Sequence, residues 1–287
     1  MNNIPLITLK PNSTEIVKIQ TGWFGWGDRR EAFFVWDEGP IWDGNPGGIL
    51  RSLVGTPVST NVQATIFNNE LIVSGFGRMQ NFNPGITIIN SITNMIIGDV
   101  ITEINNQQFP NHLNLTSLRI GNQVTRIGNH AFRNCPVLTS VTFGNNVRTI
   151  WNNSFEICIS LTSVTFPNSL VELGSAVFWG CTGLTSIVIP NNVTTIGTSC
   201  FGNCPSLTSI TIGSSIVSVG GSSFNIGVGV PSVLQTVTIL RPQPPVINNT
   251  VFQNRPLQNV ILQVPRGSLS LYQNAVGWRD FGIIQEL

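Results

Sequence analysis

The sequence contains few charged residues, and the charges that it has are balanced. Only 9% of its 287 residues are charged, against roughly 25% in soluble proteins generally. The formal net charge is +1, from 14 Lys and Arg against 13 Asp and Glu. Because nucleic-acid binding requires clustered cations that displace counterions, we predict no nucleic-acid partner. A surface made polar by Asn, Ser, Thr and Gln suits an extracellular, cell-surface or virion-exposed protein.

The sequence also lacks a long hydrophobic run. It has no stretch of about 18 or more apolar residues, so it predicts no membrane span. Residues 1–20 lack the cationic start and the apolar segment of a secretory signal peptide. Two explanations stay open: the native protein leaves its cell by another route, or Met1 was added to a trimmed chain.

Residue types that carry chemistry are scarce as well. There are two histidines, His112 and His130, and five cysteines. The chain has no HExxH motif, phosphate-binding glycine loop, GxSxG motif or paired carboxylates. We therefore predict no catalytic residue, no metal site and no cofactor, and a protein that is not an enzyme.

What the sequence does contain is a repeat. Copies begin at Leu115, Leu138, Leu161, Leu184 and Leu207, each 23 residues after the last. The register extends back to Ile92, and forward to Leu234 after a four-residue insertion and then to Leu257. A fixed period of this length is typical of solenoid proteins.

Each copy combines two short apolar segments with a closing aromatic residue. Alternating apolar positions predict a short strand with one buried face, as in Val141/Phe143, Val164/Phe166 and Ile187/Ile189. A Gly-Asn or Pro-Asn turn signal follows, and then a second apolar pair such as Val147 and Ile150. The copies close on a Phe and a Cys: Phe132/Cys135, Phe155/Cys158, Phe178/Cys181 and Phe201/Cys204.

No single copy buries these apolar faces alone, whereas stacked copies bury them in a continuous core. The pattern therefore predicts a repeat solenoid, mainly β, in which the four phenylalanines stack inside a column of 23-residue copies. The cysteines form a ladder along this column. Stacked side chains run parallel, which is poor geometry for a disulfide, so we predict five buried, reduced thiols. Asn122, Asn145, Asn168 and Asn191 form another ladder, which we interpret as structural.

The copies, for example LTSVTFGNNVRTIWNNSFEICIS, resemble the BspA-like leucine-rich repeats of bacterial surface proteins and some protist adhesins. The tail VILQVPRGSLSLYQNAVGWRDFGIIQEL is similar to the C-terminal cap of that family. Residues 69–79, NELIVSGFGRM, are similar to the hairpin that often precedes its first repeat. The resemblance implies a leucine-rich-repeat column and a binding role, because family members are mostly associated with adhesion. It implies no particular ligand.

Four segments are expected. Residues 1–59 match no family pattern and are predicted as a β-rich segment and potential anchor. Residues 60–91 are predicted as a hairpin that caps the solenoid, residues 92–256 as leucine-rich repeats, and residues 257–287 as a last repeat with a C-terminal cap.

The candidate binding residues are those that break the repeat, because a repeated surface does not specify one partner. Trp151 replaces the Gly of other copies, Trp179 occupies a position held elsewhere by Arg, Glu or Gly, and Arg241 adjoins the prolines of residues 242–245. Both tryptophans have an alternative role as fillers of gaps between smaller neighbours. The N-terminal tryptophans are either a contact surface or the core of a small β-domain: Trp23, Trp26, Trp36 and Trp42.

Two functions from different classes are compatible with these features. The first is a non-catalytic recognition or adhesion protein that presents its solenoid to a protein or glycan partner, outside the cell or on a cell surface. The second is a structural subunit of a phage particle or surface appendage, anchored in a larger assembly by residues 1–59. An enzyme is a distant third alternative.

Overall fold

The computed structural model describes residues 17–20, 31–37, 49–51, 62–67, 69–75, 77–79 and 91–287. The chain divides into two units, Met1–Val54 and Gly55–Leu287. In the first unit, an antiparallel sheet is formed by β1 (Val17–Gln20), β2 (Glu31–Asp37) and β3 (Ile49–Arg51), in that order. The anchoring role of residues 1–59 stays a prediction.

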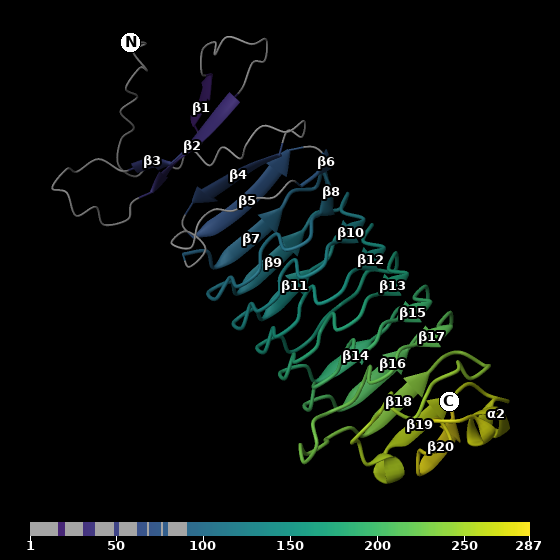
Figure 1. Cartoon of the computed structure of the whole chain (residues 1–287). Coiled ribbons are helices and arrows are strands. Elements are labelled where there is room, and N and C mark those ends of the chain that lie inside the picture. The colour runs from purple at the N-terminus through teal and green to yellow at the C-terminus, as the bar shows by residue number, and fades with distance from the viewer. Residues whose placement is uncertain are drawn as a thin grey trace. The chain divides into compact units, whose positions relative to one another are not determined.

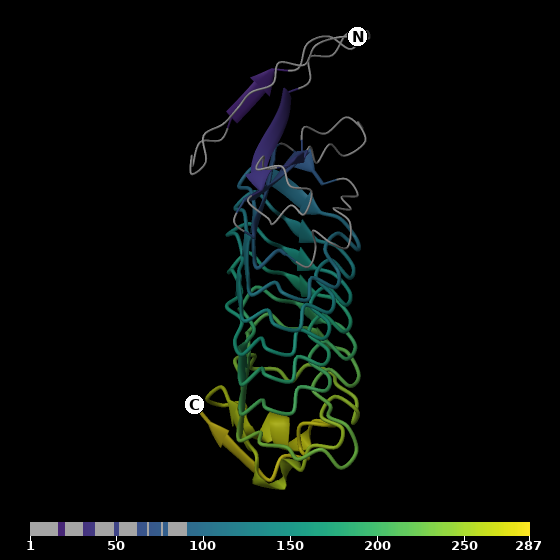
Figure 2. The same cartoon turned by 90° about the vertical axis from the view of Figure 1, so that its left-hand side faces the viewer.

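The second unit is a parallel β-solenoid of about nine turns spaced about 23 residues apart (Figures 1 and 2). This confirms the fold predicted from the repeat. Within the described part of the chain, helix is limited to η1 (Leu257–Asn259) and α2 (Leu269–Asn274). Neither helix is long and apolar enough to cross a membrane.

One side of the solenoid is a continuous seven-stranded parallel sheet (Figure 1). Pairing joins residues 23 positions apart, for example Ile127 with Ile150 and Ile150 with Leu173. These side chains are fully buried, so the second apolar pair of each copy faces the core. In chain order the strands are β6 (Gly77–Arg78), β8 (Ile101–Ile104), β10 (Arg126–Ile127), β12 (Thr149–Ile150), β13 (Glu172–Leu173), β15 (Thr195–Ile196) and β17 (Ser218–Val219).

The strands predicted from the first apolar pair lie in two further five-stranded sheets, which also contain strands from the hairpin before the repeats and from the C-terminal cap. The first contains β4 (Val62–Phe67), β5 (Glu70–Gly75), β7 (Asn94–Ile97), β9 (Ser117–Ile120) and β11 (Ser140–Thr142). The second contains β14 (Ser186–Val188), β16 (Ser209–Ile212), β18 (Thr236–Ile239), β19 (Ile261–Val264) and β20 (Ile283–Glu286). Pairing is parallel throughout, except in the antiparallel hairpin of β4 and β5.

The gap between these two sheets corrects one prediction. The strand expected at Val164 and Phe166 is absent, and its coil keeps a single bridge, from Thr142 to Thr165. The side chains of Val164 and Phe166 are nevertheless buried, each with 8% exposure. The apolar alternation therefore gave the correct inward face but the wrong backbone pairing.

The gap has a steric cause. Pro167 and Pro190 occupy a position that is Gly in neighbouring coils, where the coils approach closely. A Cβ atom added to Gly144 or Gly213 would lie 2.1 or 2.3 Å from a carbonyl oxygen of the preceding coil. Proline carries a Cβ atom and lacks the N–H donor. Two successive prolines therefore keep the coil of Pro167 from pairing fully with its neighbours, whereas β14 in the coil of Pro190 still pairs with β16.

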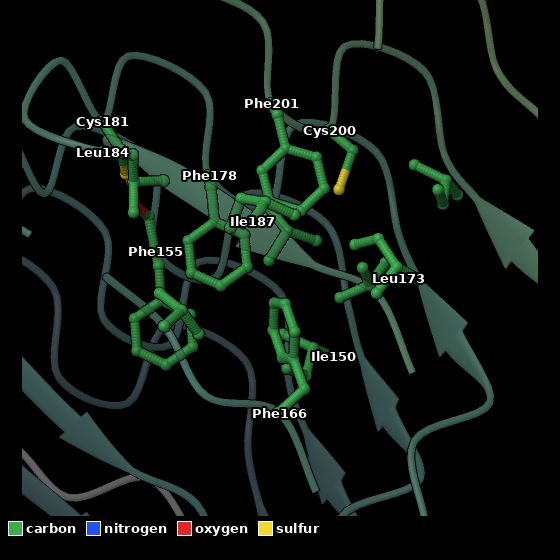
Figure 3. Packing of buried hydrophobic residues seen from close by; sticks show 14 of the residues in the cluster. Ile150, Phe155, Phe166, Leu173, Phe178, Cys181, Leu184, Ile187, Cys200 and Phe201 are labelled. Atoms are coloured by element: carbon green, nitrogen blue, oxygen red, sulfur yellow. Dashed lines mark hydrogen bonds between the residues drawn. The ribbon is translucent and has the colours of Figure 1, made fainter. Parts of the chain in front are cut away.

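A column of stacked phenylalanine rings runs through the core (Figure 3). Phe155, Phe178 and Phe201 stack with ring centroids 5.4 Å apart and interplanar angles of 4–5°. The column continues at 5.3–5.5 Å in both directions, to Phe132 and Phe109 on one side and to Phe224 and Phe252 on the other. All four phenylalanines predicted to stack inside the column are completely buried.

The C-terminal segment closes this column. Trp278 and Phe281 pack edge-on against Phe252, with ring centroids 6.1 and 5.2 Å from it. The Trp278 indole N–H donates to the Pro245 carbonyl at 2.9 Å, and the Tyr272 hydroxyl of α2 donates to the Arg241 carbonyl at 2.7 Å. The end of the chain is thus fixed to the last coils through both aromatic packing and hydrogen bonds.

Candidate binding surface

The cysteines lie inside the column and form a hydrogen-bond ladder. All five are free and buried, as predicted. The Sγ atoms of Cys158, Cys181 and Cys204 donate to the carbonyl oxygens of Phe132, Phe155 and Phe178 in the preceding coil, at 3.5, 3.2 and 3.3 Å. The sequence indicated small apolar fillers. The structure adds that the thiols satisfy buried backbone acceptors, which supports a structural role.

The equivalent position is polar in the coil before the cysteine ladder and, past Gly227, in the coil of Phe252. His112 replaces Cys there, and its Nδ1 lies 2.9 Å from the Phe109 carbonyl oxygen. Arg255 stands three residues after Phe252, as each Cys stands three residues after its Phe. Its Nε donates to the Phe224 carbonyl at 2.5 Å. This correspondence was hidden in the sequence because the insertion shifts the register.

Burial of the thiols predicts that the protein becomes less stable in alkaline solution. Burial raises the pKa of Cys158, Cys181, Cys200 and Cys204 above the usual 9.0. Because the pKa of these thiols is higher in the folded state than in the unfolded chain, the protein keeps its full stability below about pH 9, where the thiols are protonated in both states. Stability falls as the pH rises from about 9 towards about 12, the folded-state pKa of Cys204. Each thiol reduces the free energy of unfolding by at most about 1.4 kcal/mol per pH unit.

Urea unfolding at pH 8 and pH 10 measures this effect, and we expect a lower midpoint at pH 10. Cys200→Ala is a matched variant, because Ala131 occupies the equivalent position in another coil. This variant should reduce the pH dependence of the unfolding midpoint by the contribution of one thiol. Equal midpoints at the two pH values would contradict the prediction.

The asparagine ladders are structural too. The Asn122 Oδ1 atom accepts the backbone N–H of Asn145 at 3.2 Å, one coil further on. A second ladder links Asn129, Asn152 and Ser175 in the same way, at 3.0 and 2.7 Å. Repeated positions are thus explained by stacking, and specific recognition has to come from residues that depart from the repeat.

Trp151 departs from a row of glycines. It follows β12 directly, at the position of Gly128 and Gly197. A Cβ atom at either glycine would lie within 2.5 Å of the preceding coil's backbone. Trp151 is half-buried, and the guanidinium carbon of Arg126 lies 4.5 Å from its ring centroid. The tryptophan therefore makes a cation–π contact on the outer side of the seven-stranded sheet.

Arg126 links Trp151 to further charged residues. Its Nη2 lies 2.5 Å from Glu103 Oε2, and the same carboxylate oxygen lies 3.3 Å from Arg78 Nε. Arg78 also donates to Asn105 Oδ1 at 2.6 Å. We call Arg78, Glu103, Arg126 and Trp151 the Trp151 patch. Its carboxylate and ring hold the Arg126 guanidinium in a fixed orientation while about a quarter of the Arg126 side chain stays exposed.

Trp179 lies in a different neighbourhood. It is half-buried, and a Cβ atom added to Gly202 would lie 2.9 Å from its Cδ1 atom. The indole therefore packs against Gly202 in the following coil, whereas Trp151 packs towards the preceding one. Among the described residues, no aromatic contact joins the two tryptophans. The position of Trp179 is held in the two preceding coils by Arg133 and Glu156, which form an ion pair at 2.7 Å.

Arg241 belongs to the loop that receives the C-terminal cap. Its Nε donates to the Gln243 carbonyl at 3.0 Å, and its own carbonyl accepts the Tyr272 hydroxyl. These contacts, together with that of Trp278 to Pro245, account for the break in the repeat at residues 242–245. A binding role for Arg241 stays a prediction.

The N-terminal candidates are mostly outside the described residues. This applies to Trp23, Trp26 and Trp42. Trp36 lies in β2, opposite Leu50 of β3. Within the described ranges, no three His, Cys, Asp or Glu residues are grouped so that they could hold a metal ion.

Comparison with known proteins gives the following similarities. Residues 102–227 match the model of the BspA type leucine rich repeat region, in six copies. A leucine-rich repeat protein of T. pallidum is 22% identical, over 64% of this chain and 86% of that chain, with a TM-score of 0.43. One from Eubacterium ventriosum is 16% identical over 72% and 76% (TM-score 0.38), and one from Bacteroides ovatus is 15% identical over 81% and 77% (TM-score 0.38). No curated protein matches the chain.

The matched copies coincide with the coils whose phenylalanine, cysteine and asparagine ladders are described above. They share the period of the solenoid, about 23 residues. Residues 102–227 of this column are therefore BspA-type leucine-rich repeats.

Proposed function

We propose that this chain is a non-catalytic recognition protein of the adhesion type, acting outside the cell or on a cell surface. In this role its solenoid presents an outer surface to a protein or glycan partner. Repeat proteins of this architecture use extended surfaces for binding, and the core of the column is filled by apolar side chains. The supporting surface chemistry is a low charge density with a few ordered charged groups among the described residues, of which the Trp151 patch also includes an aromatic side chain.

The Trp151 patch is the observation that carries the proposal. Trp and Arg are the residue types most enriched at the energetic centres of protein interfaces. Here the two stack on each other, and Glu103 forms an ion pair with the Nη2 group of the arginine. Such preorganisation reduces the side-chain entropy that is lost on binding. Nothing in the repeat requires a tryptophan at this position, because glycine occupies it in Gly128, Gly174 and Gly197.

Trp151→Gly is a sharp test of the patch, because it restores the residue of the other coils. Binding is first measured by surface plasmon resonance against a panel of purified extracellular matrix proteins and immobilised glycans. For the panel members that bind, we expect the variant to weaken affinity about 30-fold or more, the loss typical of an interface hot spot. Stability should fall by about 1–2 kcal/mol, between the values for an exposed and a desolvated cation–π contact.

Two further variants complete this experiment. Thr195→Ala changes the outer row of the same sheet in a coil beyond the patch, and we expect no effect on binding. Trp179→Gly tests the second predicted tryptophan separately. Full affinity in Trp151→Gly would overturn the assignment of the patch, and a panel without any binding partner would count against the recognition function itself.

The alternative of a virion or appendage subunit gains no support from the described residues or from the similar proteins. None of the observed contacts favours it over recognition, so we do not propose it.

A further inference from the structure

A small cleft lies at the C-terminal end of the solenoid, away from the residues of the Trp151 patch. Its volume is about 270 Å³, slightly below the range of roughly 300–1,000 Å³ for drug-sized ligand sites. It therefore suits a ligand of about one ring. The lining comes from the last coil, from η1 and from the cap: Asn248, Asn249, Phe252, Gln253, Asn254, Arg255, Leu257, Gln258, Gly277 and Asp280.

The walls of the cleft are fixed by contacts outside it. The Asn248 Oδ1 atom accepts the backbone N–H and the hydroxyl of Thr250, at 3.1 and 2.6 Å. Asn254 Nδ2 donates to the Ile226 carbonyl at 2.8 Å. On the cap side, Gly277 has φ +80°, and a Cβ atom there would lie 2.8 Å from the Ile247 side chain. The loop and the cap thus meet closely, and the cleft is preformed.

Arg255 supports the floor of the cleft, but its donors are committed to the protein. It is only 6% exposed, and its Nε bonds the Phe224 carbonyl. Its Nη1 donates to Ser232 Oγ at 3.2 Å, and its Nη2 to the Cys204 carbonyl at 2.8 Å. The cleft therefore does not offer a guanidinium fork to an anionic ligand.

The polar groups that remain available are mainly amides. The side chains of Asn249, Gln253 and Gln258 are exposed and make no hydrogen bond within the described part of the chain. The Asp280 carboxylate is also exposed and has no ion-pair partner among the described residues. Phe252 and Leu257 also line the cleft, but they are only 5% and 8% exposed, so the surface that the cleft offers is mainly polar. The cleft thus presents amide donors and acceptors with a small apolar contribution, and its one unpaired charged side chain among the described residues, Asp280, is negative.

This combination selects a class of ligand. A pyranose ring carries hydroxyls that both donate and accept, which matches side-chain amides, and its C–H groups suit the small apolar part of the lining. An anion is disfavoured by Asp280, and a purely apolar ligand by the ring of amides, which would lose hydration. We propose that the cleft binds a single neutral hexose, the end of an uncharged glycan. This deepens the recognition function proposed above and rests on it, since it assigns a glycan to a second contact site.

The test is a titration of the full chain, ¹⁵N-labelled, with free glucose, galactose, mannose and N-acetylglucosamine, followed by NMR. We expect shifts of the side-chain amide signals of Asn249, Gln253 and Gln258 with at least one hexose. The dissociation constant should be on the order of millimolar, as is usual for a small ligand with few contacts. Glucuronate, which carries a negative charge, should bind at least tenfold more weakly than glucose.

Gln258→Ala and Asp280→Ala should each weaken hexose binding at least tenfold. Gln235→Ala, an exposed amide outside the cleft, should leave it unchanged. Melting temperatures equal to that of the wild type show that each variant is folded. The proposal is overturned by an absence of shifts with all four sugars, by equal binding of glucuronate, or by full binding in Gln258→Ala. Trp151→Gly should not affect these shifts, so failure of the cleft is distinguishable from failure of the Trp151 patch.

Discussion

Phe178→Ala is expected to lower the free energy of unfolding by about 3–5 kcal/mol, the usual loss for a fully buried phenylalanine. The ring has no exposed surface and stacks on Phe155 and Phe201, both at 5.4 Å. Phe166 contacts its edge at 5.7 Å. Removal of the ring leaves a cavity in the middle of the column, where stacked coils above and below have little freedom to close it. Urea unfolding followed by circular dichroism measures the change.

Val188→Ala is the control for Phe178→Ala. Val188 lies in β14 close to the same coil, but 59% of it is exposed, so its truncation should change stability by less than about 0.5 kcal/mol. Stability in a solenoid is a sum over nearest-neighbour interfaces, so both sides of the cavity contribute to the loss. A loss below about 1 kcal/mol for Phe178→Ala would mean that the column repacks around the gap.

Arg255→Met is expected to lower the free energy of unfolding by about 2–4 kcal/mol. Methionine preserves much of the side-chain stem, but it removes the donor of the Phe224 carbonyl. The Ser232 hydroxyl and the Cys204 carbonyl keep only long hydrogen bonds, from the Leu234 and Leu207 N–H groups at 3.4 and 3.5 Å. An unsatisfied buried acceptor costs about 1–3 kcal/mol, and relief from the desolvation of a buried cation offsets part of the sum. Burial lowers the pKa of Arg255 to about 10, which reflects this desolvation.

Arg279→Met serves as the matched control, because Arg279 is exposed in the cap and makes no ion pair within the described ranges. We expect its thermal unfolding to stay close to that of the wild type. If Arg255→Met were as stable as Arg279→Met, the desolvation of the guanidinium would equal or exceed the value of its hydrogen bonds. Arg255 would then not be a stabilising end of the ladder.

The fold was predictable because the repeat relates distant residues by one rule. Once Phe132, Phe155, Phe178 and Phe201 recur every 23 residues, stacking follows from the need to bury them. The rule failed at residues 163–166, where the local alternation is intact but the strand is absent. Pairing there depends on how closely two coils approach, and Pro167 and Pro190 change that distance. A pattern within one copy does not report the contact between copies.

The candidate surface was only partly predictable. Departure from the repeat identified Trp151, but not its neighbour Arg126, because the two are 25 positions apart and meet only when the coils stack. The equivalence of Arg255 with the cysteines was not predictable, because the insertion before Leu234 disrupts the register that would have aligned them. The cleft was not predictable from the sequence either, because its walls meet only when the cap packs against residues 242–249.

The gap between β11 and β14 has a mechanical consequence. At the coil of residues 161–183, the seven-stranded sheet is intact, whereas the opposite side has one β-bridge and single backbone hydrogen bonds such as that from the Thr185 N–H to the Thr162 carbonyl. Because this coil has fewer inter-coil backbone contacts on that side, we expect the column to bend more easily here than at other coils. Bending there would keep the seven-stranded sheet paired and would open or close the side interrupted by the prolines. The Trp151 patch lies before this coil and the C-terminal cleft after it, so such bending would change the distance between the two.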